Sequence, residues 1–202
     1  MEINSVLHKI DKIKFQAFQL SRTSSFTMKL LFTFIIAGLT GLCAQIKIIL
    51  QFTPVPISGQ TFEVLIAGIL LGKWWTGISQ IIYAVLGILG VPWFAGFKSG
   101  LMIPTFGYIL GFILSAFFIG YCIDHYKIRN FMKIFIILIF ANFILIYIPG
   151  LIFLGYWLNK TSFTSFKQIL FLGAVPFILG DIIKICLVTM LSKIILPNEK
   201  LN

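Results

Sequence analysis

The sequence predicts an all-α membrane protein, and three properties of its composition and patterning carry that prediction. Of its 202 residues, 59% are hydrophobic and 11% are charged, and the mean hydropathy is +1.02. A soluble domain has about 25% charged residues, so this chain has too few polar side chains to cover a soluble globule. The apolar stretches are continuous and do not alternate with a period of two, which favours membrane helices over a β-barrel. An ordinary soluble enzyme, a disordered chain and a nucleic-acid-binding domain are excluded.

We expect six membrane spans in one transmembrane domain that covers residues 28–196. The expected spans are residues 28–50, 61–71, 74–89, 104–123, 131–154 and 169–196. A crossing needs about 20 residues, and the second and third spans are shorter than that, so we expect residues of their flanking loops to enter the membrane. Two irregular Pro/Gly-rich stretches, residues 51–60 and 90–100, interrupt the apolar pattern.

The first 27 residues are amphipathic. Apolar residues recur at helical spacing between Ile3 and Leu20, and Lys9, Lys12 and Lys14 occupy much of the other side. This pattern is typical of a helix on the cytoplasmic membrane surface, and a frayed tail is the alternative. No apolar core followed by a small-residue cleavage site occurs there, so we predict no signal peptide. Residues 197–202 are expected to form a cytoplasmic tail.

The basic residues predict the orientation. With the N-terminus inside, 11 Lys and Arg residues fall on inner segments and 4 on outer segments, with Lys184 left inside the sixth span. By the positive-inside rule, both termini of this multi-pass protein lie in the cytoplasm and both Pro/Gly-rich stretches face the outside. The net charge of +10 therefore reflects membrane topology rather than nucleic-acid binding.

Asp181 and Lys184 are the strongest candidate site residues. They lie inside an apolar helix, where each charge costs at least about 2.5–3.5 kcal/mol. Their i, i+3 spacing places them on one helix face. One interpretation is an ion pair that helps both charges survive insertion. The other is a polar ligand site between helices, in which the carboxylate accepts from ligand N–H groups and the ammonium meets a ligand anion.

The first irregular stretch is expected to act as a lid. Pro54 and Pro56, which follow Thr53, stiffen it and remove two backbone donors, so it can fold back over a cavity. Gln60 can supply both a donor and an acceptor to a ligand amide. The alternative is a simple turn with Gln60 facing water.

The second irregular stretch carries Trp93 and Phe94 among glycines, with Tyr83 ten residues upstream. Aromatic side chains at a bilayer edge usually form an interfacial belt. The alternative is an apolar clamp around a ligand ring.

Other residues that could carry chemistry give weaker signals. Glu63 either pairs with Lys47 or Lys98 or faces the outer interface, and the sequence does not decide between these. No His, Cys or carboxylate cluster has metal-ligand spacing, and no G-x-S-x-G motif is present. The sequence predicts no enzyme, no metal site and no cofactor.

Four ordered blocks of the sequence resemble the BioY family. They are Thr53–Gly72, which contains TPVPISGQTF, Gly87–Gly96 (GILGVPWFAG), Pro104–Phe112 (PTFGYILGF) and Gly180–Lys184 (GDIIK). The similarity extends over roughly residues 37–190. Members of this family are biotin-binding S components of energy-coupling-factor (ECF) transporters.

This resemblance implies a fold, a ligand and partners. It implies six helices in the cytoplasmic membrane of a prokaryote, with a biotin site near the outer face under the first loop. It also implies that Asp181 and Lys184 are the polar contacts of biotin. Charge assigns Asp181 to the ureido N–H groups and Lys184 to the valerate. Ala37 and Gly41 would face a membrane coupling subunit, which drives transport together with two ATPase subunits.

Three positions depart from the pattern of the family, and three other functions stay open. Ile49 stands where proline is expected near the end of the first span. Ile103 and Phe106 stand where the family usually has glycines, so their side chains are expected to narrow the pocket or shift the loop. The alternatives are capture of a different vitamin, an intramembrane enzyme that uses Asp181 as acid or base on lipid, and an assembly subunit without a ligand.

Overall fold

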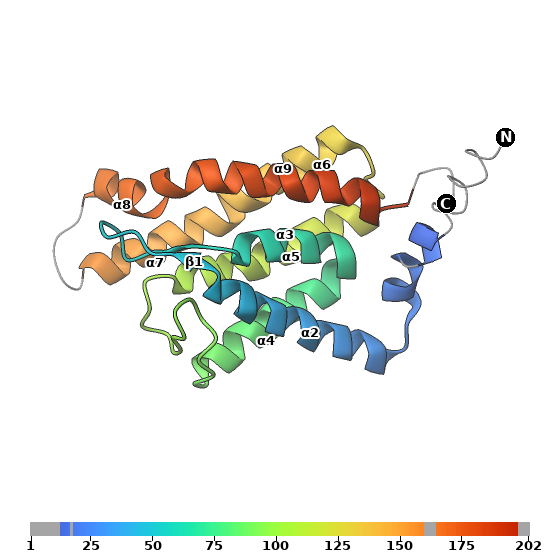
Figure 1. Ribbon diagram of the computed structural model, residues 1–202, viewed down its shortest axis with the longest axis horizontal. Helices are drawn as coiled ribbons and strands as arrows, with labels where there is room; N and C mark the ends of the chain where they lie inside the picture. Colours follow the sequence, from blue (N-terminus) through green and yellow to red (C-terminus); the bar gives the residue numbers. More distant parts are fainter. Residues whose placement is uncertain (1–12, 17, 160–164, 198–202) are drawn as a thin grey trace.

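The computed structural model describes residues 13–16, 18–159 and 165–197, and these are mostly helical (Figure 1). Four helical segments in the described residues are long and apolar enough to cross a membrane. They are α2 (Phe26–Gln45), α5 (Phe106–His125), the segment Phe131–Asn159 and the segment Phe166–Ile195. Two shorter apolar helices, α3 (Gln60–Leu71) and α4 (Lys73–Ile88), complete the bundle.

The N-terminal amphipathic prediction falls only partly within the described residues. Residues 13–16 and 18–23 are helical, and Ser25 then begins α2 by accepting a hydrogen bond from the Met28 amide at 3.4 Å. Residues 1–12 and most of the predicted tail, residues 198–202, lie outside the described residues.

The first predicted span, residues 28–50, ends earlier than expected. Helix α2 ends at Gln45 because the chain becomes extended and forms strand β1 (Lys47–Ile48), which pairs antiparallel with β2 (Ile57–Ser58). The first irregular stretch is therefore the tip of a short two-stranded ribbon. We call the end of the bundle that carries residues 46–59 and 89–105 the loop end (left in Figure 1).

Helices α3 and α4 are separated by Gly72, whose φ of +78° favours glycine. At this end of the bundle, opposite the loop end, Arg22 forms an ion pair with Asp124 at 3.1 Å. The same guanidinium donates to the carbonyl oxygens of Ile69 and Leu70. These carbonyls belong to the last turn of α3, where helical partners are missing, so Arg22 caps that helix.

The last two predicted spans, residues 131–154 and 169–196, are each divided in the structure. The first consists of α6 (Phe131–Phe140), the π-helix η1 (Ala141–Ile146) and α7 (Tyr147–Asn159). The second consists of α8 (Phe166–Gly173), the 3-10 turn η2 (Val175–Phe177) and α9 (Ile178–Ile195). Pro176 lies in η2 and cannot donate a helical hydrogen bond, which accounts for the break.

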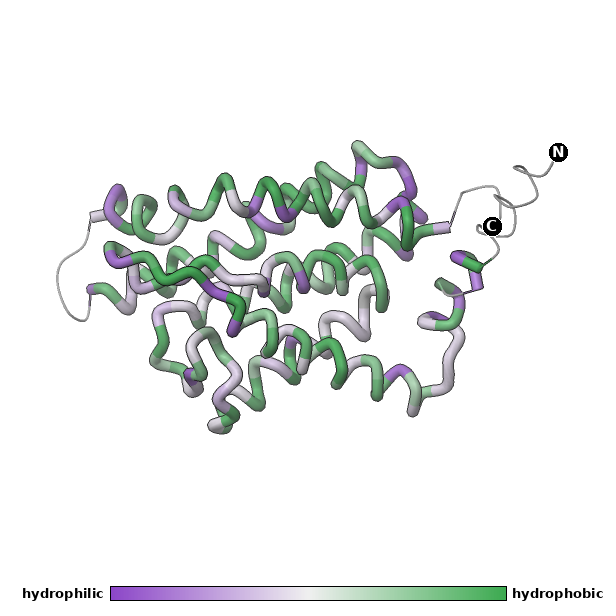
Figure 2. Tube along the Cα trace, viewed as in Figure 1, coloured by the Kyte–Doolittle hydropathy of each residue, from purple (hydrophilic) through white to green (hydrophobic). Residues whose placement is uncertain are grey.

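Helix α5 is central and packs against α3, α4, α7 and η1. A Cβ atom added at Gly107 would lie 2.3 Å from the Pro149 carbonyl oxygen, and one at Gly111 would lie 2.5 Å from Ile146 Cα. These small residues thus permit close helix approach within the chain. Figure 2 shows hydrophobic colour along most of the helices, with hydrophilic colour mainly at turns and at a few points inside the bundle.

Candidate binding site

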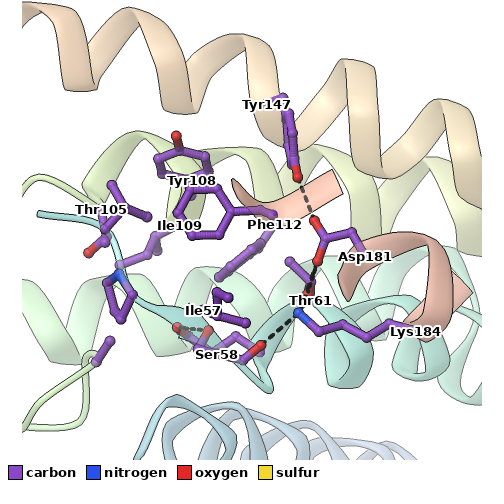
Figure 3. Close-up of a pocket in the computed structure, with 15 residues that line it drawn as sticks. Ile57, Ser58, Thr61, Thr105, Tyr108, Ile109, Phe112, Tyr147, Asp181 and Lys184 are labelled. Atoms are coloured by element: carbon purple, nitrogen blue, oxygen red, sulfur yellow. Dashed lines mark hydrogen bonds and ion pairs between the residues drawn. The ribbon is translucent and has the colours of Figure 1, made fainter. Parts of the chain in front are cut away.

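A cavity near the loop end contains both Asp181 and Lys184 in its wall (Figure 3). We call it the inner cavity. Its volume is about 50 Å³, enough for a few waters on a scale where one water needs about 10–15 Å³. The ribbon and α3 contribute Val55, Pro56, Ile57, Ser58, Gln60 and Thr61, and the rest of the wall is Ala95, Thr105, Tyr108, Ile109, Phe112, Tyr147, Phe177, Asp181 and Lys184.

Asp181 lies in the first turn of α9 and is only 3% exposed. Its Oδ1 accepts hydrogen bonds from Lys184 Nζ at 2.9 Å and Thr61 Oγ1 at 3.3 Å. Its Oδ2 accepts from Tyr147 OH at 2.8 Å and Asn142 Nδ2 at 3.0 Å. Four donors fill the lone pairs of one carboxylate, and the positive end of the α9 dipole adds to its stabilisation.

The Lys184 ammonium also has a full set of hydrogen-bond partners. Its Nζ donates to Ser58 O at 2.8 Å, to Thr61 Oγ1 at 2.8 Å and to Asp181 Oδ1 at 2.9 Å. An ammonium has three N–H donors, so all of them are used. The predicted i, i+3 ion pair is confirmed, and the bond to Ser58 also joins α9 to β2.

Gln60 lies in the cavity wall, as a ligand-binding role requires, and is 5% exposed. Its amide nitrogen donates to Tyr83 OH at 2.8 Å, and its amide oxygen accepts from Ser58 Oγ at 3.1 Å. An amide group has two N–H donors and two acceptor lone pairs. Gln60 therefore keeps one donor and one acceptor beyond these bonds.

The three predicted aromatic residues form a cluster behind Gln60 and are not part of the inner cavity wall. Tyr83 and Phe94 are fully buried, with ring centroids 5.3 Å apart. Trp93 Nε1 donates to Tyr83 O at 3.0 Å, and Tyr83 OH donates to Trp93 O at 3.3 Å. The structure thus places these rings as support for the second irregular stretch rather than at the cavity surface.

The first irregular stretch contributes Val55, Pro56, Ile57 and Ser58 to the wall of the inner cavity. Pro56 lines the inner cavity, whereas Pro54 lies further out. Thr53 Oγ1 donates to Leu172 O at 2.6 Å, which ties the stretch to α8. Ile103 and Phe106, expected to narrow the pocket, instead pack in the apolar core and are absent from the cavity wall.

Three other predicted residues also lie inside the chain. Ala37 is fully buried, and a Cβ atom added at Gly41 would lie 3.1 Å from Trp93 Cβ. Neither therefore forms part of the chain's surface in this conformation. Glu63 pairs with neither Lys47 nor Lys98 and is buried: it is 5% exposed and accepts a hydrogen bond from Thr40 Oγ1 at 2.6 Å.

The sequence analysis missed several residues of the site, chiefly Asn142, Tyr147 and Tyr108. Asn142 offered a signal, because it is the one amide or charged side chain between residues 134 and 158. The two tyrosines offered none in a chain that is 16% aromatic. Among the described residues, no group of three or more His, Cys, Asp and Glu side chains is placed to hold a metal ion.

The sequence of this chain is similar to those of a known family and of named relatives. The sequence model of the BioY family matches residues 13–199. A relative named "Probable biotin transporter BioY" from Methanothermobacter thermautotrophicus is 45% identical over 139 residues, which is 66% of this chain and 88% of the relative. "Biotin transporter BioY" from Rhizobium etli is 30% identical over 188 residues, which is 89% of this chain and 96% of the relative.

One solved structure shares the fold. Its title is "Crystal structure at 2.1 A of the S-component for biotin from an ECF-type ABC transporter". The TM-score is 0.73 at 25% sequence identity, and the alignment covers 83% of this chain and 89% of that chain.

Proposed function

Because this chain belongs to the BioY family, we propose that it is the biotin-binding subunit of a biotin uptake transporter of the ECF type. It captures the vitamin from outside the cell and delivers it across the cytoplasmic membrane of a prokaryote. The names of the relatives and of the similar structure support this function. They describe transport proteins, so neither an intramembrane enzyme nor a different cargo is favoured.

One observation in the chain itself carries the proposal. The buried Asp181–Lys184 pair lies in the wall of a cavity beneath the first irregular stretch. A purely structural ion pair has no need to border a cavity, whereas a polar ligand site does. Burial adds selectivity, because a site with buried polar groups rejects analogues that leave those groups unpaired.

The ureido ring of biotin is assigned to Asp181 and Gln60. Asp181 accepts from the ureido N–H groups in exchange for one of its present donors, since its lone pairs are filled. Gln60 offers its remaining donor and acceptor to the same ring. Tyr83, Trp93 and Phe94 support Gln60 from behind through the Tyr83 hydroxyl.

Residues 46–59 serve as a lid over this site. The inner cavity has room for only a few waters, which is less than a bicyclic vitamin with its tail requires, so the wall has to move for binding. The bonds from Lys184 to Ser58 and from Thr53 to Leu172 hold the stretch down. Pro54 and Pro56 let it move as a stiff unit.

The chain crosses the membrane six times with its loop end outside. Helices α3 and α4 have 12 and 16 residues, and each makes a crossing with help from its flanking loops. The excess of basic residues at the opposite end supports a cytoplasmic location for both termini. The helical residues 13–16 and 18–23 then lie on the cytoplasmic surface of the lipid bilayer.

A membrane coupling subunit and two ATPase subunits are the proposed partners. Contact through Ala37 and Gly41 requires α2 to separate from Trp93, because both residues are covered in this conformation. Apolar side chains already exposed on α2, such as Leu31, Phe34 and Leu42, are available to lipid or to a subunit without that movement.

Equilibrium binding to the detergent-purified chain tests the proposed function. Labelled biotin is titrated, with unlabelled biotin, riboflavin and thiamine as competitors. We expect saturable binding that only biotin displaces. Displacement by another vitamin would reassign the cargo, and no binding by folded protein would overturn the proposal.

A further inference from the structure

A second cavity lies directly beside the inner one at the loop end. We call it the outer cavity; its volume is about 150 Å³. Pro56, Ala95 and Thr105 line both cavities, so the two share a wall formed by the two irregular stretches and the residue that precedes α5. Lys47 and Lys98 also line the outer cavity, and no acidic residue in the described part of the chain does.

Both lysines extend from fixed backbone. Lys47 pairs with Ser58 in the ribbon. Lys98 forms a bridge with Phe94, with N···O distances of 3.0 and 3.3 Å. The Lys47 ammonium lies against the second irregular stretch, because a Cβ atom added at Gly96 would be 2.6 Å from Nζ. Neither ammonium forms an ion pair with any residue that the structure describes.

Lys184 contrasts with these two lysines. Its three N–H donors already bind Ser58, Thr61 and Asp181. A carboxylate that approached Lys184 would have to displace the Ser58 carbonyl or separate the buried ion pair. A carboxylate that approached Lys47 and Lys98 would displace only solvent and gain two positive charges, which makes the outer cavity the better anion site.

From this difference we infer that Lys47 and Lys98 bind the carboxylate of the cargo, and that Lys184 is a positioning residue for Asp181 and β2. The ureido ring then lies in the inner cavity and the valerate extends into the outer one. The inference rests on the proposed function and replaces the assignment of the valerate to Lys184 that charge alone suggests. It also explains why positive charge is present on the outer loops.

The test compares biotin with biotinamide, whose tail is uncharged, on the full chain in detergent. A charge-assisted contact is worth about 1.5–3 kcal/mol, so wild type is expected to bind biotin about tenfold tighter or more. In the double variant Lys47→Gln/Lys98→Gln the ratio of the two affinities falls to about one, because both ligands lack a charged contact there. Biotinamide loses at most neutral hydrogen bonds to the two side chains, so its affinity falls much less than that of biotin. Lys167→Gln, which removes an exposed lysine of α8 outside both cavities, is the matched control and keeps the wild-type ratio.

Lys184→Gln separates the two assignments. If Lys184 only positions its neighbours, this variant weakens biotin and biotinamide by the same factor. A ratio that collapses in Lys184→Gln but persists in the double variant would overturn the inference. So would a wild-type chain that binds both ligands equally, although the proposed function would then stand. Failure of folded wild type to bind biotin would overturn both. If Lys184→Gln does not fold, the double variant decides alone.

Discussion

Two carboxyl groups are buried to a similar degree in this bundle, yet their surroundings differ. Asp181 on α9 is 3% exposed and Glu63 on α3 is 5% exposed. Asp181 receives four donors, among them the ammonium of Lys184, and borders the inner cavity. Glu63 has the Thr40 hydroxyl on Oε2 and no partner on Oε1, and it lies outside the wall of that cavity.

This difference separates a carboxylate that is held by a counter-ion from a carboxyl group that has none. An ionised carboxylate in an apolar interior needs a cation and hydrogen bonds, and the Asp181 cluster supplies both. The Glu63 cluster supplies hydroxyl and amide groups from Thr40 and Gln80, but no cation among the described residues. We therefore expect the binding function to depend on the charge of Asp181 and not on that of Glu63.

The largest expected effect follows from removing the cation of the Asp181 cluster. Lys184→Met leaves Asp181 buried and unpaired, and breaking such a pair costs about 3–5 kcal/mol. We expect a marked fall in the thermal unfolding midpoint of the purified chain and at least tenfold weaker biotin binding, on the order of 1.4 kcal/mol. Both are measured on the same detergent preparation.

The matched control is the double variant Asp181→Asn/Lys184→Met, which removes both charges together. It should regain much of the stability, because no buried charge is left without a partner. It should not regain biotin binding, because the carboxylate is gone. A Lys184→Met protein as stable as wild type would mean that the pair is solvated, which would break the comparison.

The sequence predicted the two charges of this cluster but not the cluster. Asp181 and Lys184 are three residues apart, so one helix brings them together whatever the rest of the chain does. Asn142 and Tyr147 reach Asp181 from η1 and from the first residue of α7, and no apolar pattern predicts this π-helical segment or the turn after it. Glu63 was not placed correctly, because its partner Thr40 is 23 residues away in the sequence.

The same limit applies to the fold: its long apolar helices were predictable from the sequence, and its local breaks were not. Long apolar stretches predicted α2, α5 and the last two membrane segments, because a run of about 20 apolar residues is enough to identify a membrane span. The breaks at η1 and η2 and the ribbon at residues 47–58 depend on local hydrogen bonding and were missed. The sequence left Trp93 and Phe94 open between an interfacial belt and a ligand clamp, whereas both rings pack against Tyr83.

An intermediate effect is expected from one neutral donor of the Asp181 cluster. Tyr147→Phe removes the hydroxyl that donates to Asp181 Oδ2 at 2.8 Å, and a hydrogen bond to a charged group contributes about 1.5–3 kcal/mol. The unfolding midpoint should fall less than in Lys184→Met, and biotin should bind more weakly. Tyr156→Phe, at an exposed position of the same helix α7, serves as the control. Equal effects of the two substitutions would show that the Asp181 cluster has donors to spare.

The smallest effect is expected at Glu63, and the same chemical change at both sites makes the comparison direct. Glu63→Gln and Asp181→Asn each replace a carboxyl with an amide of nearly the same shape. At Glu63 the new amide oxygen still accepts from Thr40 Oγ1, and no cation loses its partner, so unfolding free energy should change by less than about 1 kcal/mol. Biotin affinity should stay within about twofold of wild type. At Asp181 the amide leaves the partly buried Lys184 ammonium without its counter-charge and presents an N–H₂ group to donors that need an acceptor. Asp181→Asn should therefore lose both stability and biotin affinity.

If thermal unfolding and biotin titration show that Glu63→Gln is as damaging as Asp181→Asn, binding depends on the charge of Glu63 as well, and the distinction between the two clusters fails.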